Sequence, residues 1–143
     1  MLRTLTEDSD FDGQVVFLRV DANVPLDAGV ITDDGRIKAF LPTLEWLLNK
    51  GAAVVVASHL GRPSGPENTG LSLAPVAERL AELLDTPVAL IPGVSGQLVW
   101  SSVDTLLPGQ VCMVENLRFD PRETSRDAAE RLELAMEWAD HVD

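Results

Sequence analysis

Three polar segments that each contain an arginine follow directly after short apolar runs in this sequence. The segments are 19–25 (R-V-D-A-N-V-P), 58–63 (S-H-L-G-R-P) and 115–119 (E-N-L-R-F), and the runs before them are 15–18, 54–57 and 111–114. Apolar, β-branched runs of this length are typical of buried strands. Ligand sites of open α/β sheets lie at the carboxyl ends of the strands. Arginine-bearing loops at three strand ends therefore predict a binding site for an anion.

The first segment places polar side chains two residues apart. In an extended chain, Arg19, Asp21 and Asn23 share one face. An aspartate and an asparagine there can accept from and donate to the hydroxyl groups of a small polyol or hydroxy acid. Asx residues before a proline are also typical of turns, and Arg19 can form an internal ion pair with Asp21 or another carboxylate. From these residues alone, a turn and a site both remain open.

Further cations lie near the other strand ends. Arg36 follows a turn signal at 33–35 and opens a helix. An arginine there is unfavourable with the helix dipole unless an anion docks beside it; the alternative is a solvated surface residue. His59, Gly61 and Arg62 combine a titratable donor, a flexible glycine and a fork-shaped cation that suits phosphate or carboxylate. The alternative for His59 is a hydrogen-bonded turn residue.

Arg118 lies between two apolar residues, so we expect the packing of its neighbours to hold it in place. The alternative is an ion pair with Glu115 or Asp120. We expect Arg122 to be more exposed and of less importance. His141 has no motif around it and is expected to be solvated.

Common nucleotide, metal and nucleophile motifs are missing from the sequence. It contains no G-x-x-x-x-G-K-[ST] and no G-x-G-x-x-G segment, and no Cys/His cluster indicates zinc. Residues 93–96 (G-V-S-G) do not form a nucleophile elbow. The single Cys112 cannot make an internal disulfide and is expected to be buried and inert. We expect Trp46, Trp100 and Trp138 to anchor helices to the sheet.

The composition is that of a globular protein of about one domain. The 143 residues are 45% hydrophobic and 24% charged,. The net charge of −12 argues against nucleic acid as a partner, because a phosphate backbone requires a basic face,. No apolar run approaches the roughly 20 residues that span a bilayer, and the N-terminus lacks the apolar region of a secretory signal. These features predict a cytoplasmic protein without a membrane partner.

Strand and helix patterns alternate along the chain. We expect strands at 15–20, 52–57, 88–91 and 111–115, and helices at 37–49, 74–84, 94–106 and 125–139. A loop or short hairpin is expected at 26–35 and a long loop at 58–72. Four alternations predict an α/β fold, a three-layer α/β/α, Rossmann-like parallel sheet. An acidic tail at 140–143 follows the last helix where the next strand is expected, so the sheet is expected to be incomplete.

Two helices carry more detailed expectations. In the helix at 37–49, Gly51 is expected just past the end as a C-cap, and Pro42 is expected to kink the helix or to move its start to about that residue. The last helix is expected to turn one face inward, formed by Ala128, Leu132, Ala135 and Trp138.

Taken together, these segments resemble the N-terminal domain of phosphoglycerate kinase. Residues 19–25 look like the R-x-D-x-N-x-P signature of that family, and residues 36–44 look like its R-I-x-x-x-L-P-T segment. Residues 58–63 look like its S-H-L-G-R-P loop, and residues 115–119 look like its E-N-L-R-F segment. The four motifs occur in the family's order across nearly the whole chain. By this resemblance, residues 1–143 are a partial N-terminal domain.

The resemblance implies a reversible phosphoryl transfer in glycolysis. The family converts 1,3-bisphosphoglycerate and ADP into 3-phosphoglycerate and ATP, typically as a monomer, with the triose acid on the N-terminal domain and Mg-nucleotide on the C-terminal domain. The residues that the resemblance assigns to the substrate are Asp21, Asn23, Arg36, His59, Leu60, Gly61, Arg62 and Arg118. Arg36 is also the candidate catalytic residue that steadies the transferring phosphoryl group. No general base or covalent intermediate is implied.

The family's nucleotide-binding domain, with its Mg-ATP or Mg-ADP site, has no counterpart in these residues. No metal ligand or cofactor-binding residue is therefore expected in this chain, and we expect the isolated polypeptide to be inactive, marginally stable and prone to aggregate. The alternative function is a stand-alone, non-catalytic α/β module that binds a phosphorylated small acid.

Overall fold

A four-stranded parallel sheet forms the centre of the computed structural model, which describes residues 4–66 and 68–143. The strands are β1 (Val15–Arg19), β4 (Ala53–Ala57), β5 (Ala89–Ile91) and β6 (Val111–Val114), in the spatial order β1-β4-β6-β5. A short hairpin follows β1 and consists of β2 (Leu26–Asp27) and β3 (Val30–Ile31). The predicted strands and the hairpin are confirmed within a few residues. Residue 67 of the predicted long loop lies outside the described residues.

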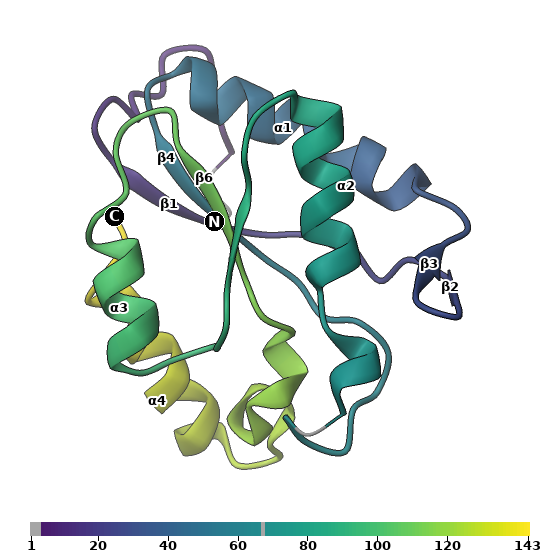
Figure 1. The fold of residues 1–143 in the computed structure, drawn as a ribbon. Coiled ribbons are helices and arrows are strands. Elements are labelled where there is room, and N and C mark those ends of the chain that lie inside the picture. The colour runs from purple at the N-terminus through teal and green to yellow at the C-terminus, as the bar shows by residue number, and fades with distance from the viewer. Residues whose placement is uncertain (1–3, 67) are drawn as a thin grey trace.

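Four α-helices connect and cover the strands. They are α1 (Gly35–Asn49), α2 (Ala74–Leu84), α3 (Gln97–Val103) and α4 (Ala128–Ala139), and three short 3₁₀ helices are η1 (Thr69–Leu71), η2 (Leu117–Phe119) and η3 (Pro121–Thr124). Figure 1 shows α1 and α2 on one side of the sheet and α3 and α4 on the other. This arrangement confirms the predicted three-layer, Rossmann-like α/β/α fold.

Strand β4 supplies side chains to two separate cores. All five of its residues are buried. Val54 and Val56 pack toward α1 and α2, whereas Val55 and Ala57 pack toward α3 and α4. Successive side chains of a strand point to opposite faces, so a strand with helices on both sides is apolar throughout. The continuous valine and alanine run is therefore the sequence signature of this central position.

Helix α1 begins earlier than its proline suggests and ends at a glycine. It starts at Gly35 and continues through Pro42, so the expectation that Pro42 sets the start is wrong. At the other end, Gly51 has φ +84 and its N–H donates to the carbonyl of Leu48, while the N–H of Ala52 donates to that of Leu47. This pair of bonds is a Schellman motif, which confirms the predicted C-cap glycine.

Helix α4 turns a different face inward from the one predicted. Leu134 and Trp138 are buried, but Leu132 is 58% exposed and Ala128 and Ala135 are exposed too. The rotation is set at the start of the helix, where the Asp127 carboxylate accepts from the Ala129 N–H and caps it,.

Aromatic contacts fix α4 against the sheet and α3. The Trp138 ring lies 4.6 Å from that of Phe17 on β1 and 4.9 Å from that of Trp100 on α3. Trp46 of α1 contacts Phe11 edge to face. His141 stacks on Trp100 and bonds Asp104, so the expectation that it is solvated is wrong.

Cys112 lies in β6 and is buried, as predicted. No helix in the described residues is long and apolar enough to cross a membrane. The loops that leave the carboxyl ends of β1, β4 and β6 lie at one edge of the sheet, because these strands are parallel neighbours. Those three loops contain the polar segments singled out in the sequence.

Candidate anion site at the strand ends

A buried asparagine holds the loop after β4 to the loop after β6. The Asn116 side chain is fully buried. Its Oδ1 accepts from the N–H groups of Leu60 and Arg118, and its Nδ2 donates to the carbonyls of Leu60 and Leu71 at 2.8 and 2.9 Å. Because buried polar groups are costly without partners, these four bonds fix the two loops against each other. The N–H and the carbonyl of Leu60 both bond Asn116, so Leu60 holds the loop in place from its buried side.

A second buried residue connects the loops after β1 and β4. The hydroxyl of Ser58 accepts from the Ala22 N–H at 2.9 Å and donates to the carbonyl of His59. The polar segment after β1 is thereby fixed next to the segment after β4.

Gly61 lies between Asn23 and Arg118. Its N–H donates to Asn23 Oδ1 at 2.9 Å, and its carbonyl accepts from Arg118 Nη1 at 3.0 Å. Gly61 has φ +58, and a Cβ there would lie 2.9 Å from a methyl carbon of Leu71. Only glycine fits this position without strain. The arrangement brings Asn23, Gly61 and Arg118 together from three loops.

Asp21 and Arg36 form an exposed ion pair at the start of α1. Arg36 Nη1 lies 3.0 Å from Asp21 Oδ1, and that oxygen also accepts from the Asn23 N–H. The Asn23 backbone bond and the Arg36 guanidinium lower the pKa of Asp21, which is therefore ionised at neutral pH. Asp21 makes an Asx turn with Asn23, which confirms the turn interpretation of this segment, and it pairs with Arg36. The site interpretation stays a prediction.

His59 lies among charged groups. Burial and the positive charge of Arg118 lower its pKa below the usual 6.5, and Arg19 acts in the same direction. Glu123 and Asp21 oppose this shift. His59 is therefore neutral at pH 7 in the free chain, and an anion bound beside it would favour its protonated form.

Arg118 has neither of the two carboxylate partners considered from the sequence. Glu115 instead accepts from Ser72 Oγ and the Leu73 N–H. Arg118 approaches Glu123 of η3, with 3.9 Å between Nε and Oε2. Arg19, the last residue of β1, lies 2.6 Å from the other oxygen of the same carboxylate.

Glu123 was not found from the sequence. It is 104 residues from Arg19 and belongs to none of the polar segments. The motif spacing therefore contains no signal for this partner.

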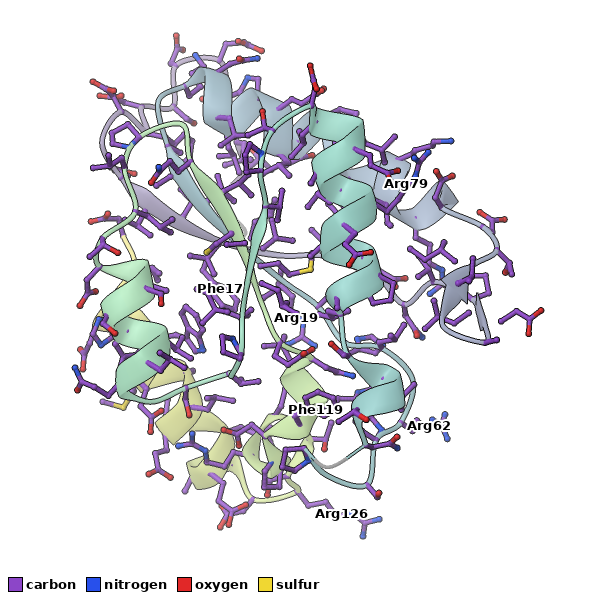
Figure 2. The ribbon with its side chains drawn as sticks, in the orientation of Figure 1. Phe17, Arg19, Arg62, Arg79, Phe119 and Arg126 are labelled. Carbon is purple, nitrogen blue, oxygen red and sulfur yellow. The ribbon has the colours of Figure 1, made fainter. Side chains whose placement is uncertain are left out.

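The Arg62 side chain is separate from these residues. Figure 2 shows it pointing away from the ribbon, whereas Arg19 lies further in, near Phe119. Arg62 is exposed, and its guanidinium makes no hydrogen bond or ion pair with the described residues.

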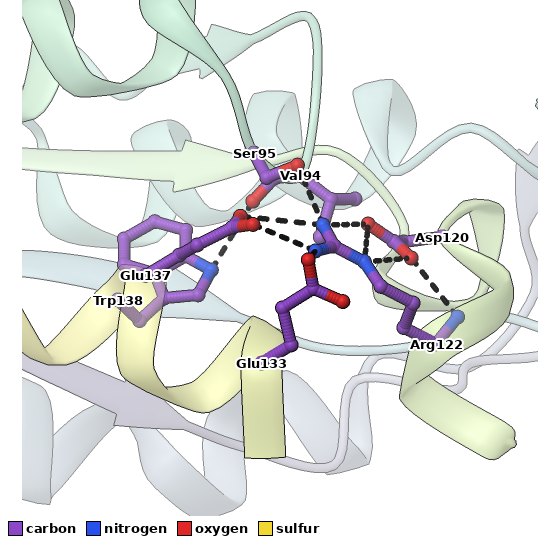
Figure 3. A network of polar contacts seen from close by, with 7 residues as sticks. All are labelled: Val94, Ser95, Asp120, Arg122, Glu133, Glu137 and Trp138. Carbon is purple, nitrogen blue, oxygen red and sulfur yellow. Dashed lines mark hydrogen bonds and ion pairs between the residues drawn. The ribbon is translucent and has the colours of Figure 1, made fainter. Parts of the chain in front are cut away.

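Arg122 is held far more tightly than expected. Its side chain is 21% exposed and pairs with Asp120 at 2.8 Å and with Glu137 of α4 at 2.7 Å, and it also donates to Ser95 (Figure 3). The hydrogen bonds that Arg122 donates to Asp120 and Glu137 raise the pKa of Arg122. The prediction that Arg122 is more exposed than Arg118 is wrong, because the Arg118 side chain is 29% exposed. Arg122 connects η3 to α4 and to the loop after β5.

A cavity lies beside this network and apart from the predicted residues. It has a volume of about 640 Å³, and its lining includes Ser72, Phe119 and Arg122. None of the residues predicted to bind substrate lines it. The predicted residues instead lie on the loops at the carboxyl edge of the sheet, where Leu60 is buried and Arg62 is exposed.

The arrangement suits anion binding. Arg36 pairs with Asp21, Gly61 links Asn23 to Arg118, and His59 feels the charges of both Arg118 and Asp21. Guanidinium forks bind phosphate and carboxylate oxygens bidentately. In the described part of the chain, no group of three or more His, Cys, Asp or Glu side chains could hold a metal ion.

Comparison with known proteins gives a consistent result. The family model described as phosphoglycerate kinase matches residues 6–143. A phosphoglycerate kinase of Streptomyces avermitilis is 57% identical over 120 residues, covering 84% of this chain and 30% of that protein. One of Corynebacterium urealyticum is 54% identical over 129 residues, covering 90% of this chain and 32% of that protein.

Solved structures agree with the sequence matches. The crystal structure of phosphoglycerate kinase from Pyrococcus horikoshii superimposes with a TM-score of 0.85 at 35% identity, over 96% of this chain and 34% of that one. The enzyme from Coxiella burnetii gives a TM-score of 0.75 at 33% identity, over 95% and 32% of the two chains. The chain thus spans about a third of the length of these relatives. It belongs to the phosphoglycerate kinase family.

Proposed function

We propose that this chain binds the triose acid of phosphoglycerate kinase, as 3-phosphoglycerate or 1,3-bisphosphoglycerate. The observation that carries the proposal is the meeting of three loops, from β1, β4 and β6, through Asn23, Gly61 and Arg118. In the whole protein the reaction is reversible phosphoryl transfer between 1,3-bisphosphoglycerate and ADP, giving 3-phosphoglycerate and ATP in glycolysis. A cytoplasmic, monomeric enzyme is the corresponding expectation for the whole protein.

The polar residues then divide between the two ends of the substrate. Asn23 Oδ1 is occupied by Gly61, so its Nδ2 is the group that donates to a glycerate oxygen. Asp21, ionised, accepts from a glycerate hydroxyl. His59, Arg62 and Arg118 bind the phosphate and carboxyl oxygens, which for Arg62 requires its side chain to turn toward the other residues.

Arg36 is the catalytic residue in this proposal. It is the second residue of α1, whose first turn contains no acid to offset the helix dipole. The carboxylate of the N-cap residue Asp34 does not offset the helix dipole either, because Lys38 and Arg79 neutralise its charge. A helix N-terminus and a guanidinium together stabilise the negative charge of a transferring phosphoryl group. Phosphoryl transfer depends mainly on such positioning and electrostatic stabilisation.

Nucleotide binding lies outside the proposal for this chain. Neither of the two common glycine-rich nucleotide motifs occurs in the sequence, which supports this proposal,. We propose that the 143-residue polypeptide neither binds ATP nor turns over. A 3-phosphoglycerate-dependent ATPase signal from the purified chain would overturn this part.

The binding proposal is tested by calorimetry with 3-phosphoglycerate. We expect saturable binding that Arg36→Ala weakens by about tenfold to a hundredfold, because a charge-assisted contact to the carboxylate that accepts the phosphoryl group is lost. Lys50→Ala is the matched control, since Lys50 carries the same charge at the opposite end of α1. Absence of saturable binding, or equal weakening by both substitutions, would contradict the proposal.

A second candidate is a stand-alone module that binds a phosphorylated acid without chemistry. It is favoured by the fact that the loops of the site all belong to this chain. Both candidates predict binding of 3-phosphoglycerate. They differ in whether added partner protein that supplies the nucleotide half restores phosphoryl transfer, which only the kinase half would allow.

A further inference from the structure

Glu123 occupies a central position behind the proposed triose-phosphate site. Its side chain is only 9% exposed although it is a carboxylate on a short surface helix, η3. One oxygen lies 2.6 Å from Arg19 Nη2, and the other lies 3.9 Å from Arg118 Nε. Arg19 ends β1 and Arg118 follows β6, so a single carboxylate, five residues beyond Arg118 in the connection to α4, links the ends of two strands at the site.

The contact to Arg118 is incomplete in the free chain. Arg118 Nε and Glu123 Oε2 are both buried, and neither has a hydrogen-bond partner among residues 4–66 and 68–143. A buried charged group without a partner is costly. The two atoms are one short movement away from a hydrogen bond, since such bonds form at about 3 Å.

Arg118 is otherwise restrained at one point. Its Nη1 donates to the Gly61 carbonyl, and its side chain remains 29% exposed. Nη2 makes no hydrogen bond with the described residues and is the donor left for a ligand. The guanidinium is therefore directed by Gly61 on one edge and by Glu123 on the other.

We propose that Glu123 is a positioning residue that orients Arg19 and Arg118 for the bound phosphorylated acid. In this proposal, the ligand's anion draws the Arg118 guanidinium into place, and the Arg118 Nε–H then donates to Glu123 Oε2. Glu123 does not touch the ligand. The inference rests on the proposed function and deepens it, because it assigns a residue that holds the site's cations in place.

The direction in which one substitution changes the affinity for the anion separates a positioning role of Glu123 from a simple effect of its charge. Glu123→Gln keeps the size of the side chain and removes a negative charge beside two arginines. If Glu123 acted by charge alone, its removal would strengthen the attraction of the site for an anion. If Glu123 positions the arginines, the same substitution weakens binding, because misdirected guanidinium groups lose their bidentate geometry.

Calorimetry of the 143-residue chain with 3-phosphoglycerate measures this sign. We expect the dissociation constant of Glu123→Gln to rise on the order of tenfold, the effect of one misdirected charge-assisted hydrogen bond. Glu45→Gln is the matched control, because Glu45 is exposed on α1 near Gly109, at the opposite edge of the sheet. Its dissociation constant should stay unchanged. Tighter binding by Glu123→Gln would overturn the proposal.

A second variant covers the case in which Glu123→Gln does not fold. Glu123→Asp keeps the charge but is shorter by one methylene, so it cannot reach both arginines. Positioning predicts weaker binding of 3-phosphoglycerate by Glu123→Asp, whereas a pure charge effect predicts no change. An unchanged dissociation constant overturns the proposal.

A ligand-free measurement separates this inference from the proposed function. The Nε–Hε signals of Arg19 and Arg118 in nitrogen-15 NMR spectra report how firmly each guanidinium is held. We expect Glu123→Gln to shift the Arg19 signal and to speed its hydrogen exchange in the free chain, with Arg79 as an internal reference. If the wild-type chain does not bind 3-phosphoglycerate, the proposed function fails, and an unchanged Arg19 signal would overturn the positioning role independently.

Discussion

Among single residues, His59 has the environment that responds most directly to a bound anion. It is neutral in the free chain because burial and Arg118 lower its pKa below 6.5. A doubly charged ligand in the same place compensates for those cations and raises the pKa again. The free and the bound chain therefore differ in proton content over a window that lies around and below the usual histidine value.

We predict that sulfate binds more tightly as the pH falls from about 7.5 to below 6.5, since the bound state holds more protons than the free state,. Sulfate is the suitable probe because it does not titrate near neutral pH, unlike a phosphate ester. Calorimetry across this range measures the slope, which should be reduced severalfold in His59→Gln. An equal slope in both proteins would assign the proton to another group.

The sequence indicates which residues belong to the candidate site better than it indicates which side chains they contact. Six candidate site residues could be selected from the sequence because each follows a recognisable apolar run or turn signal. They are Asp21, Asn23, Arg36, His59, Gly61 and Arg118. The partners of the arginines could not. Arg118 was compared with Glu115 and Asp120, which are close in sequence, but their carboxylates are bound to Ser72 and Arg122. Glu123 becomes a partner only because the fold places η3 next to Arg19, at the end of β1.

At the scale of elements, the segment from η2 to α4 depends on the cluster around Arg122. Asp120 caps η3 by accepting from the Arg122 N–H, and its carboxylate also binds the Arg122 guanidinium. Burial opposes ionisation of Asp120, but the bonds from Arg122 outweigh it and lower the pKa of Asp120. Glu137 continues the cluster into α4, so one side chain fixes the angle between η3 and the last helix.

Arg122→Ala is predicted to lower the free energy of unfolding by about 2 kcal/mol, because it leaves partly buried carboxylates without their main partner. Chemical denaturation measures this value. Arg126→Ala is the control, since the Arg126 side chain points into solvent in Figure 2, and its effect should stay within about 0.5 kcal/mol,.

Acid should remove the difference between wild type and Arg122→Ala. The folded-state pKa of Asp120 is lowered from 3.8, so its contribution is present above that value and is lost as the pH falls through the lowered pKa,. A stability difference between the two proteins that persists in strong acid would show that Arg122 acts by packing alone.

Element types were easier to predict than element faces. The strand at 53–57 is apolar throughout because helices cover both of its sides,. The last helix offers two overlapping stripes that share Trp138, and the helical period does not choose between them. The choice follows from the Asp127 cap and the packing of Trp138 between Phe17 and Trp100, which are distant in sequence.

At the scale of the whole molecule, the sheet has two different kinds of strand. β4 and β6 each have a neighbour on both sides, whereas β1 and β5 have one each among the described strands. Next to β1, a groove of about 420 Å³ is lined by apolar side chains that include Phe17, Leu134 and Trp138. On the outer side of β1, Val15 bonds Asp143 through both its N–H and its carbonyl, and the rest of this edge lies beside the apolar groove. A strand edge that is only partly covered and lies beside an apolar groove favours self-association.

We predict that hydrogen exchange in the dilute monomer divides the sheet accordingly. Hydrogen-bonded amides of β4 and β6 should exchange through global unfolding, and those of β1 should exchange at least about tenfold faster through local opening. NMR-detected exchange measures both classes. Equal protection across all four strands would contradict the expectation of a marginally stable chain.

The labelling rate of Cys112 reports how often the central sheet opens. Burial in the middle of the sheet raises the pKa of its thiol to about 12, and only a thiolate reacts with disulfide reagents,. Labelling must therefore wait until β6 separates from its neighbours and the thiol reaches solvent. Because the chain has no other cysteine, the labelling rate of the unmodified protein measures how fast its central strand opens. No reporter group needs to be introduced.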